Sequence, residues 1–193
     1  MITAVVTVSL DGVMQAPGGF DEDTRGGFAH GGWAAAYGDE VMAREMGVGQ
    51  GEPRALLFGR RTYENFYAVW PNRPEPNPFT QVLNKAPKYV ASTTLAEPLP
   101  WMNSTLVKGD VPEAVARLKA ESDMVILGSG ALVRSLLPHD LIDQFVLLIH
   151  PLVLGSGERL FAQAGPLAKF ELVKSVPTTT GVIIATYRTQ ANG

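Results

Sequence analysis

The sequence predicts an α/β domain in which a mostly parallel central sheet is covered by helices on both faces and ends in an antiparallel hairpin. Three observations lead to this class. Apolar, β-branched runs alternate along the chain with segments of helical periodicity. Several of these runs are continuously apolar, which is typical of strands buried on both faces of a parallel sheet. Two further runs, over residues 170–176 and 182–187, flank a short turn-forming segment and predict the hairpin.

The N-terminal part of the chain predicts two strands, two helices and one long irregular segment. Residues 2–10 are rich in β-branched side chains and predict the first strand. Residues 11–32 lose this pattern and contain seven glycines, which is typical of a lid or a binding loop. A helix is predicted over residues 34–46, followed by a strand over 55–58 and a second helix over 62–69.

Four prolines then interrupt the pattern, at Pro71, Pro74, Pro76 and Pro78. Each proline lacks a backbone N–H and restricts the residue before it, so we predict a surface loop without regular structure. Beyond this loop the alternation resumes. The predicted strands cover residues 88–92, 105–107, 124–127 and 142–149, and the predicted helices begin at Pro112 and span residues 131–137.

Composition limits the function classes. The 193 residues suit one compact domain over residues 1–193, and 46% hydrophobic with 18% charged residues is a globular balance. The net charge of −3 is not gathered into a basic stripe, so we expect no binding to nucleic acid. The chain has no cysteine and only three scattered histidines, which argues against a metal cluster. No apolar run approaches the roughly 20 residues of a membrane helix, so we expect a soluble, cytoplasmic protein.

Two segments carry the strongest functional signal. Residues 57–64 and 125–132 both run from an apolar strand through glycine into a helical pattern. A helix N-terminus offers unpaired N–H groups and the positive end of the helix dipole, so it holds an anion without a special side chain. Arg60 and Arg61 add guanidinium groups beside the first turn, and Thr62 adds a hydroxyl. Two such turns favour a dinucleotide over the alternative of plain strand-to-helix turns.

Four motifs extend this signal over nearly the whole chain. They are SLDG at residues 9–12, FGRRTY at 58–63, ILGSG at 126–130 and PLVLGSG at 151–157, which closes in LF at 160–161. In this order they resemble the dihydrofolate reductase-like superfamily. More closely, they resemble its branch that contains the C-terminal reductase domain of riboflavin biosynthesis, the RibD C-terminal family. The resemblance implies a three-layer α/β/α dihydrofolate reductase-like fold.

The resemblance also implies NADPH as cofactor. It places Arg60, Ser92 and Thr93 near the adenosine 2′-phosphate and Thr62 near the pyrophosphate. It further implies a cis peptide bond between Gly128 and Ser129. The full set of implied cofactor-binding residues is Gly59, Arg60, Arg61, Thr62, Ser92, Thr93, Gly128, Ser129, Gly130, Ala131 and Leu132.

The candidate catalytic and substrate-binding residues lie in the glycine-rich segment and just after it. Asp11 either orients the substrate or a catalytic water, or it serves the turn before Gly12. His30 is either a proton donor or a solvated loop residue. Trp33 and Tyr37 either stack on a flat heterocycle or belong to the core.

The predicted function is an NADPH-dependent oxidoreductase that transfers a hydride to a small heterocyclic or ribosylamino substrate. It would resemble 5-amino-6-(5-phosphoribosylamino)uracil reductase of riboflavin biosynthesis. Such an enzyme needs basic side chains for the ribose phosphate, and the candidates are Arg25, Arg44 and Arg159. The alternatives are a dihydrofolate reductase-type pterin reductase, with Asp39 or Glu40 as its carboxylate, and a non-catalytic NADPH-binding protein. We expect a small-molecule substrate and a homodimer.

Overall fold

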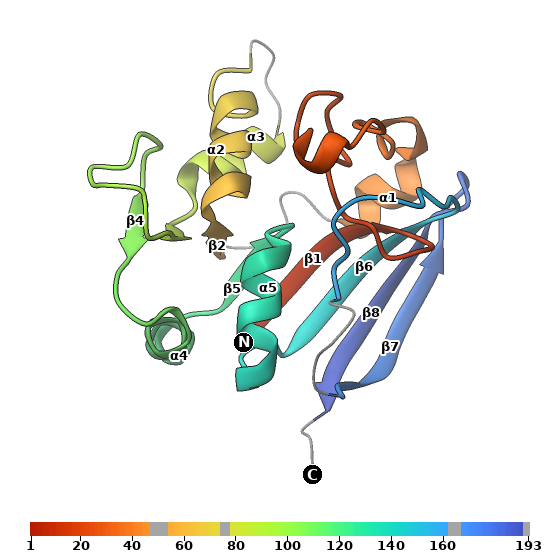
Figure 1. Ribbon diagram of the computed structural model, residues 1–193. Coiled ribbons are helices and arrows are strands. Elements are labelled where there is room, and N and C mark those ends of the chain that lie inside the picture. Colours follow the sequence, from red (N-terminus) through yellow and green to blue (C-terminus); the bar gives the residue numbers. More distant parts are fainter. Residues whose placement is uncertain (47–53, 74–77, 162–166, 191–193) are drawn as a thin grey trace.

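The computed structural model describes residues 1–46, 54–73, 78–161 and 167–190. Its centre is a sheet with the strand order β4-β3-β2-β5-β1-β6-β8-β7 (Figure 1). All neighbouring pairs from β4 to β6 are parallel, whereas β8 pairs antiparallel with both β6 and β7. The strands are β1 (Ile2–Ser9), β2 (Ala55–Gly59), β3 (Lys88–Ala91), β4 (Ser104–Val107), β5 (Met124–Leu127), β6 (Gln144–His150), β7 (Lys169–Pro177) and β8 (Ile183–Gln190).

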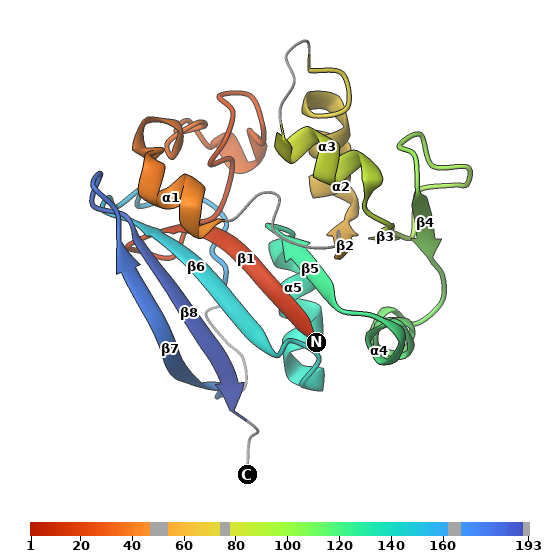
Figure 2. The same cartoon turned by 180° about the vertical axis from the view of Figure 1, so that it is seen from behind.

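Helices cover both faces of this sheet, which confirms the predicted α/β class with its C-terminal hairpin. Helices α4 and α5 lie over one face, and Figure 2, seen from behind, shows α1 and α3 over the other. The α-helices are α1 (Glu40–Glu45), α2 (Arg60–Val69), α3 (Pro78–Lys85), α4 (Val111–Glu121) and α5 (Gly130–Leu136). Short 3₁₀ turns are η1 (Arg25–Gly27), η2 (Ala35–Tyr37) and η3 (Leu137–His139).

The two faces of the sheet bury separate apolar clusters, because successive residues of a strand point to opposite sides. On β2, Leu57 belongs to the cluster beneath α4 and α5, whereas Phe58 belongs to the cluster with α2 and α3. Both side chains are fully buried. The continuous apolar run on this strand is therefore explained by burial on both faces, as the sequence predicted.

The predicted helix over residues 34–46 is wrong as a single element. The chain forms the turn η2, becomes extended at Gly38 and Asp39, and only then forms α1. The carboxylate of Asp39 accepts a hydrogen bond from the Met42 N–H at 2.7 Å and so caps the new helix. The helical periodicity of the sequence thus continues across Gly38 and Asp39, although these two residues interrupt the helix.

The prediction of a loop at the prolines is wrong at Pro78, which begins helix α3. Proline is well tolerated at the first helical position, since the missing N–H has no partner within the helix there and its φ is already suitable. Pro71 does lie in a turn, whereas Pro74 and Pro76 lie outside the described residues. A proline that would break a helix interior therefore starts one here.

Tyr63, in the first turn of α2, joins that helix to the core. Its side chain is buried, and its hydroxyl accepts a hydrogen bond from the backbone N–H of Trp101 at 3.0 Å while donating to the Ser104 hydroxyl at 3.3 Å. The phenol thus pairs a buried N–H that lies far away in the sequence.

We expect Tyr63→Phe to lower the free energy of unfolding by about 1–3 kcal/mol, because the buried Trp101 N–H loses its acceptor. Chemical denaturation followed by fluorescence measures this change. Tyr67→Phe is the matched control on the same helix and is expected to stay within about 0.5 kcal/mol of the parent protein. Equal effects of the two variants would contradict the assigned role.

Candidate functional site

A cleft of about 740 Å³ opens at the carboxyl ends of the parallel strands. The segment between β1 and α1 and the helix α2 rise side by side from this edge of the sheet (Figures 1 and 2). Ligands of open α/β sheets bind at such an edge. The cleft is therefore the candidate functional site.

The first glycine turn joins β2 to α2. Gly59 ends the strand and precedes the helix with extended backbone, so the first N–H groups of α2 have no partner within the helix. The Arg60 guanidinium forms an ion pair of 3.0 Å with Glu64 one turn along. Arg61 is exposed, and within the described part of the chain it forms no ion pair or hydrogen bond. This turn leaves one guanidinium free at a helix N-terminus.

The second glycine turn joins β5 to α5 through two residues in the left-handed region. Gly128 has φ of 57° and Ser129 has φ of 50°. The expected cis peptide between them is wrong, since the cis bond found among the described residues is Glu97–Pro98. The left-handed pair achieves the sharp reversal with a trans peptide.

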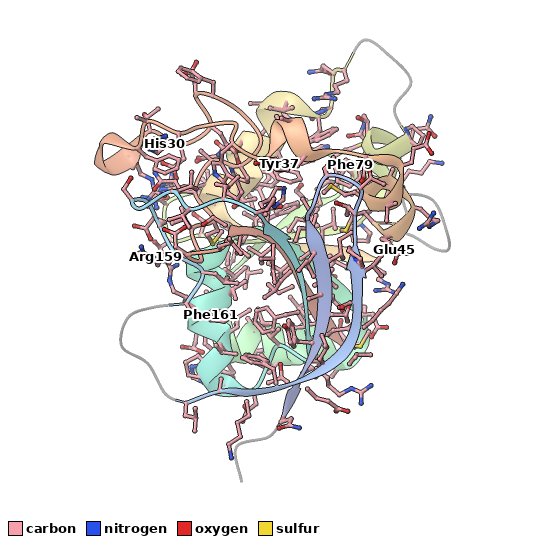
Figure 3. The ribbon with its side chains drawn as sticks, turned by 90° about the vertical axis from the view of Figure 1, so that its right-hand side faces the viewer. His30, Tyr37, Glu45, Phe79, Arg159 and Phe161 are labelled. Atoms are coloured by element: carbon pink, nitrogen blue, oxygen red, sulfur yellow. The ribbon has the colours of Figure 1, made fainter. Side chains whose placement is uncertain are left out.

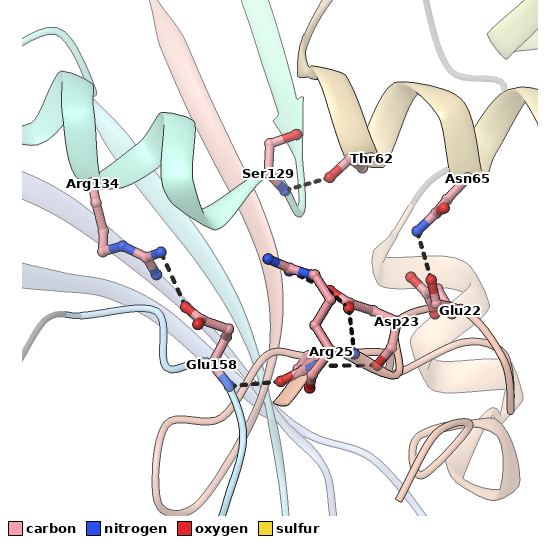
Figure 4. Close-up of polar contacts among 9 residues, drawn as sticks. Glu22, Asp23, Arg25, Thr62, Asn65, Ser129, Arg134 and Glu158 are labelled. Atoms are coloured by element: carbon pink, nitrogen blue, oxygen red, sulfur yellow. Dashed lines mark hydrogen bonds and ion pairs between the residues drawn. The ribbon is translucent and has the colours of Figure 1, made fainter. Parts of the chain in front are cut away.

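Ser129 links the two glycine turns. Its hydroxyl accepts a hydrogen bond from the Gly59 N–H at 3.1 Å and donates to the Leu127 carbonyl at 3.1 Å. Its backbone N–H donates to the hydroxyl of Thr62 at 3.2 Å (Figure 4). The side chain is buried, so these bonds are shielded from water. The two turns are thus fixed side by side in the wall of the cleft.

All of the residues expected to bind the cofactor line this one cleft. They come from the turn before α2, the segment after β3 and the turn before α5, and they are Gly59, Arg60, Arg61, Thr62, Ser92, Thr93, Gly128, Ser129, Gly130, Ala131 and Leu132. The Ser92 hydroxyl accepts hydrogen bonds from the N–H groups of Thr94 and Leu95, which fixes the turn after β3. Three segments far apart in the sequence meet here.

Asp11 does not line the cleft, because its carboxylate is used within the fold. It accepts hydrogen bonds from the Ser9 hydroxyl at 2.6 Å, the Leu154 N–H at 3.1 Å and the Gly155 N–H at 2.9 Å. The bond from Ser9, followed by those from the two backbone groups, lowers the pKa of Asp11 to about 2. The SLDG motif therefore ties the end of β1 to the PLVLGSG motif.

The other three candidates from the N-terminal segment also lie outside the cleft lining. His30 is exposed and packs edge-on against Phe28, and Figure 3 shows it and Tyr37 on the segment that precedes α1. Trp33 donates from its indole nitrogen to the Gln15 carbonyl at 2.7 Å. Trp33 and Tyr37 both pack edge-on against His150, a buried side chain whose pKa is lowered by that burial. Their rings support the fold of the N-terminal segment.

Sequence reasoning missed several polar residues that line the cleft. They are Gln15, Glu22, Asp23, Asn65, Arg134 and Glu158, and Arg25 lines it too. All of them except Gln15 are labelled in Figure 4. Gln15 donates to the carbonyls of Asp23 and Arg25 and accepts from the Glu158 N–H at 2.9 Å. Asn65 on α2 donates to the Glu22 carbonyl across the cleft at 3.1 Å. These contacts join residues that are far apart in the sequence, so no local spacing of residues predicts them.

The described residues contain no group of three or more histidine, aspartate or glutamate side chains arranged to hold a metal ion. None of the helices in the described ranges is long and apolar enough to cross a membrane.

We expect Asp11→Asn to destabilise the protein by about 1–3 kcal/mol at pH 7, because three donors lose a charged acceptor. The folded pKa of about 2 lies below the ordinary value of 3.8, so the carboxylate stabilises the fold fully above pH 3.8 and loses this effect as the pH falls through 2. Denaturant unfolding at a series of pH values should therefore show the difference between variant and parent shrinking in acid. Asp21→Asn, at an exposed position, is the control. A difference that stays constant down to pH 2 would rule out this account.

Comparison with known proteins places the chain in a family. The model of the RibD C-terminal domain matches residues 1–184. The uncharacterized protein YyaP of Bacillus subtilis (strain 168) is 26% identical over 137 residues, 68% of this chain and 72% of its own length. The uncharacterized protein YwjB of the same strain is 29% identical over 119 residues, 61% of this chain and 63% of its own.

Solved structures agree on the fold. A protein from Shewanella sp. PV-4 attributed to riboflavin biosynthesis superposes with a TM-score of 0.71 at 23% identity and covers 98% of this chain and 99% of its own. Dihydrofolate reductase from Enterococcus faecalis, complexed with NADP(H), gives 0.61 at 17% identity, over 99% of this chain and 97% of its own. The chain therefore belongs to the RibD C-terminal domain family and has the dihydrofolate reductase-like fold.

Proposed function

We propose that this protein is an NADPH-dependent oxidoreductase that transfers a hydride to a small heterocyclic or ribosylamino substrate. One observation carries the proposal: two strand-to-helix glycine turns that line a single cleft are hydrogen-bonded to each other. Membership of the RibD C-terminal domain family supports a reductase-type activity. The NADP(H) bound to the E. faecalis protein of the same fold supports the choice of cofactor.

The residues in and around the two glycine turns suit the phosphate groups of a dinucleotide. The open N–H groups at the start of α2 would hold the pyrophosphate, with the Thr62 hydroxyl beside them. Arg61, which forms no ion pair within the described residues, and Arg60 would hold the 2′-phosphate together with Ser92 and Thr93. Gly128 has no side chain, so a ligand can come close to its backbone. A Cβ at this position would stand 3.6 Å from the Thr62 side chain and would take up that space. The site therefore fits the phosphates of NADPH.

The bound NADPH would supply the hydride, and the protein would position the reactants and exclude water from the cleft. The Gln15 amide holds the N-terminal segment against Glu158, and Asn65 ties that segment to α2, so the cleft is covered from one side. Asp11 is excluded as proton donor in this proposal, because its pKa of about 2 keeps it ionised at neutral pH. The side chains of the cleft therefore orient the reactants and exclude water.

Fluorescence titration of the purified protein with NADPH and, separately, with NADH tests the proposal. Micromolar binding of NADPH and much weaker binding of NADH is the expected result, and consumption of NADPH with a heterocyclic substrate separates an enzyme from a binding protein. If the protein bound neither NADPH nor NADH, the proposed function would be wrong. NADPH binding without turnover of any substrate would favour the non-catalytic alternative.

We expect the double variant Arg60→Ala/Arg61→Ala to lose about tenfold or more of its affinity for NADPH while its affinity for NADH changes little. The reason is that charge-assisted hydrogen bonds to the 2′-phosphate are lost and NADH has no such group. The same titration measures both. Arg117→Ala is the control, since Arg117 forms a surface ion pair with Glu113 on α4 and neither side chain lines the cleft. If the double variant lost affinity for NADPH and NADH to the same extent, the role of the two arginines would be purely structural.

A further inference from the structure

His150 is a buried histidine that the proposed function leaves unused. It is the last residue of β6, and only 2% of it is exposed. Its Nδ1 lies 3.0 Å from the carbonyl oxygen of Leu148 on the same strand, and Leu148 lines the cleft. Histidine is the side chain whose ordinary pKa lies in the physiological range, so a small change in surroundings decides its charge. This ring therefore lies next to the cleft without lining it.

Two aromatic rings from the segment between β1 and α1 pack against His150. Trp33 and Tyr37 both meet the imidazole edge-on, with ring centroids 5.2 Å and 5.3 Å away and interplanar angles of 87° and 83°. The backbone carbonyl of Tyr37 also accepts a hydrogen bond from the Thr180 hydroxyl at 2.7 Å. The imidazole is thus a contact point between this segment and the sheet.

The turn that carries Trp33 is bonded to the wall of the cleft. Three consecutive residues, Gln15, Ala16 and Pro17, line the cleft. The carbonyl of each accepts one hydrogen bond from this turn, and the donors are in order the Trp33 indole at 2.7 Å, the Gly32 N–H at 2.8 Å and the Ala34 N–H at 3.0 Å. A movement of Trp33 therefore moves residues 15–17, which form one side of the cleft.

The site of His150 favours the neutral ring. Burial lowers the pKa of His150 below its ordinary value of 6.5, because a charged imidazole loses its hydration there. The backbone carbonyls of Leu148 and Val8 would accept from a protonated ring, and they oppose this lowering to a smaller extent. The packed arrangement and a proton on His150 therefore disfavour each other.

The titratable groups on the neighbouring segments do not compensate a charge on this ring. They are the Tyr37 phenol on η2, the Asp11 carboxylate after β1 and the Asp39 carboxylate before α1. Asp11 accepts from the N–H groups of Leu154 and Gly155, and Asp39 accepts from those of Met42 and Thr179. Within the described ranges, none of the three forms a hydrogen bond or ion pair with the imidazole.

We propose that His150 is a pH-sensitive positioning residue, which holds Trp33 and residues 15–17 in place when neutral and releases them when protonated. In the released arrangement water reaches the ring, so its proton affinity returns to the ordinary value. Because the packed ring has the lower pKa, a fall in pH below 6.5 favours the released arrangement. The release does not depend on which ligand the cleft binds. Any ligand that contacts residues 15–17 would bind less tightly in acid.

Proton–nitrogen NMR of the full chain, from about pH 8 to about pH 4.5, tests the proposal. The chain has three tryptophans, so the spectrum contains three indole N–H resonances, and Trp33→Phe identifies that of Trp33. This resonance is expected to move toward that of a solvated indole, with a midpoint below pH 6.5 that it shares with the ring protons of His150. The indole of Trp101, which donates to Asn84 at 2.7 Å, is the internal control and should stay in place.

His150→Gln should abolish this movement, whereas His139→Gln, at an exposed position, should leave it unchanged. If His150→Gln does not fold, the shared midpoint in the parent protein decides, since His30→Gln and His139→Gln identify the other two histidine resonances. A Trp33 resonance that stays fixed over this range would overturn the proposal. So would a His150 midpoint at or above pH 6.5, or the same movement of Trp33 in folded His150→Gln.

Discussion

The architecture of the cleft depends on the hydrogen bonds of one serine. The Ser129 hydroxyl accepts a hydrogen bond from the Gly59 N–H, and the Ser129 N–H donates one to the Thr62 hydroxyl. These two bonds hold the turns after β2 and β5 together. It does so from a left-handed backbone conformation, which costs an L-residue about 1–2 kcal/mol. Three shielded hydrogen bonds at about 1 kcal/mol each are sufficient to offset that cost. The strain is therefore confined to the point where the two candidate phosphate turns meet.

The N-terminal segment shows how an irregular chain becomes a fixed wall. Asp11 accepts from the N–H groups of Leu154 and Gly155. The buried Gln15 donates to the carbonyls of Asp23 and Arg25 and accepts from the Glu158 N–H. Trp33 donates in turn to the Gln15 carbonyl. Because each of these bonds satisfies a backbone group that a strand or helix would have paired, the segment keeps its position without regular structure. Glycine lets two stretches of backbone approach closely, as at Gly31, where a Cβ would stand 2.0 Å from the Phe20 carbonyl oxygen.

What the sequence could predict follows from how local each signal is. The strands were predictable because burial on both faces leaves a continuous apolar run, as over Ala55–Gly59. The position of the two glycine turns was predictable because the residues of each turn are contiguous at a strand end. The polar contacts of the cleft were not, since Arg134 and Glu158, or Asn65 and Glu22, meet only after folding and have no common period in the chain. The same reason separates the correct placement of α2 from the error at Gly38, where one residue interrupts an otherwise regular pattern.

This difference between the glycine turns and the rest of the cleft has a physical basis in how each is encoded along the chain. Phosphates are held by backbone N–H groups and arginines near helix starts, so a short stretch of sequence is enough to encode them. The shape of the rest of the cleft and the balance of charge in it depend on side chains from β1, β6, α2 and α5 together. Pairing Arg25 with Asp23 and Arg134 with Glu158 sets that balance without filling the cleft. The glycine turns alone therefore do not determine what else this cleft binds, because the remaining side chains come from segments that no motif contains.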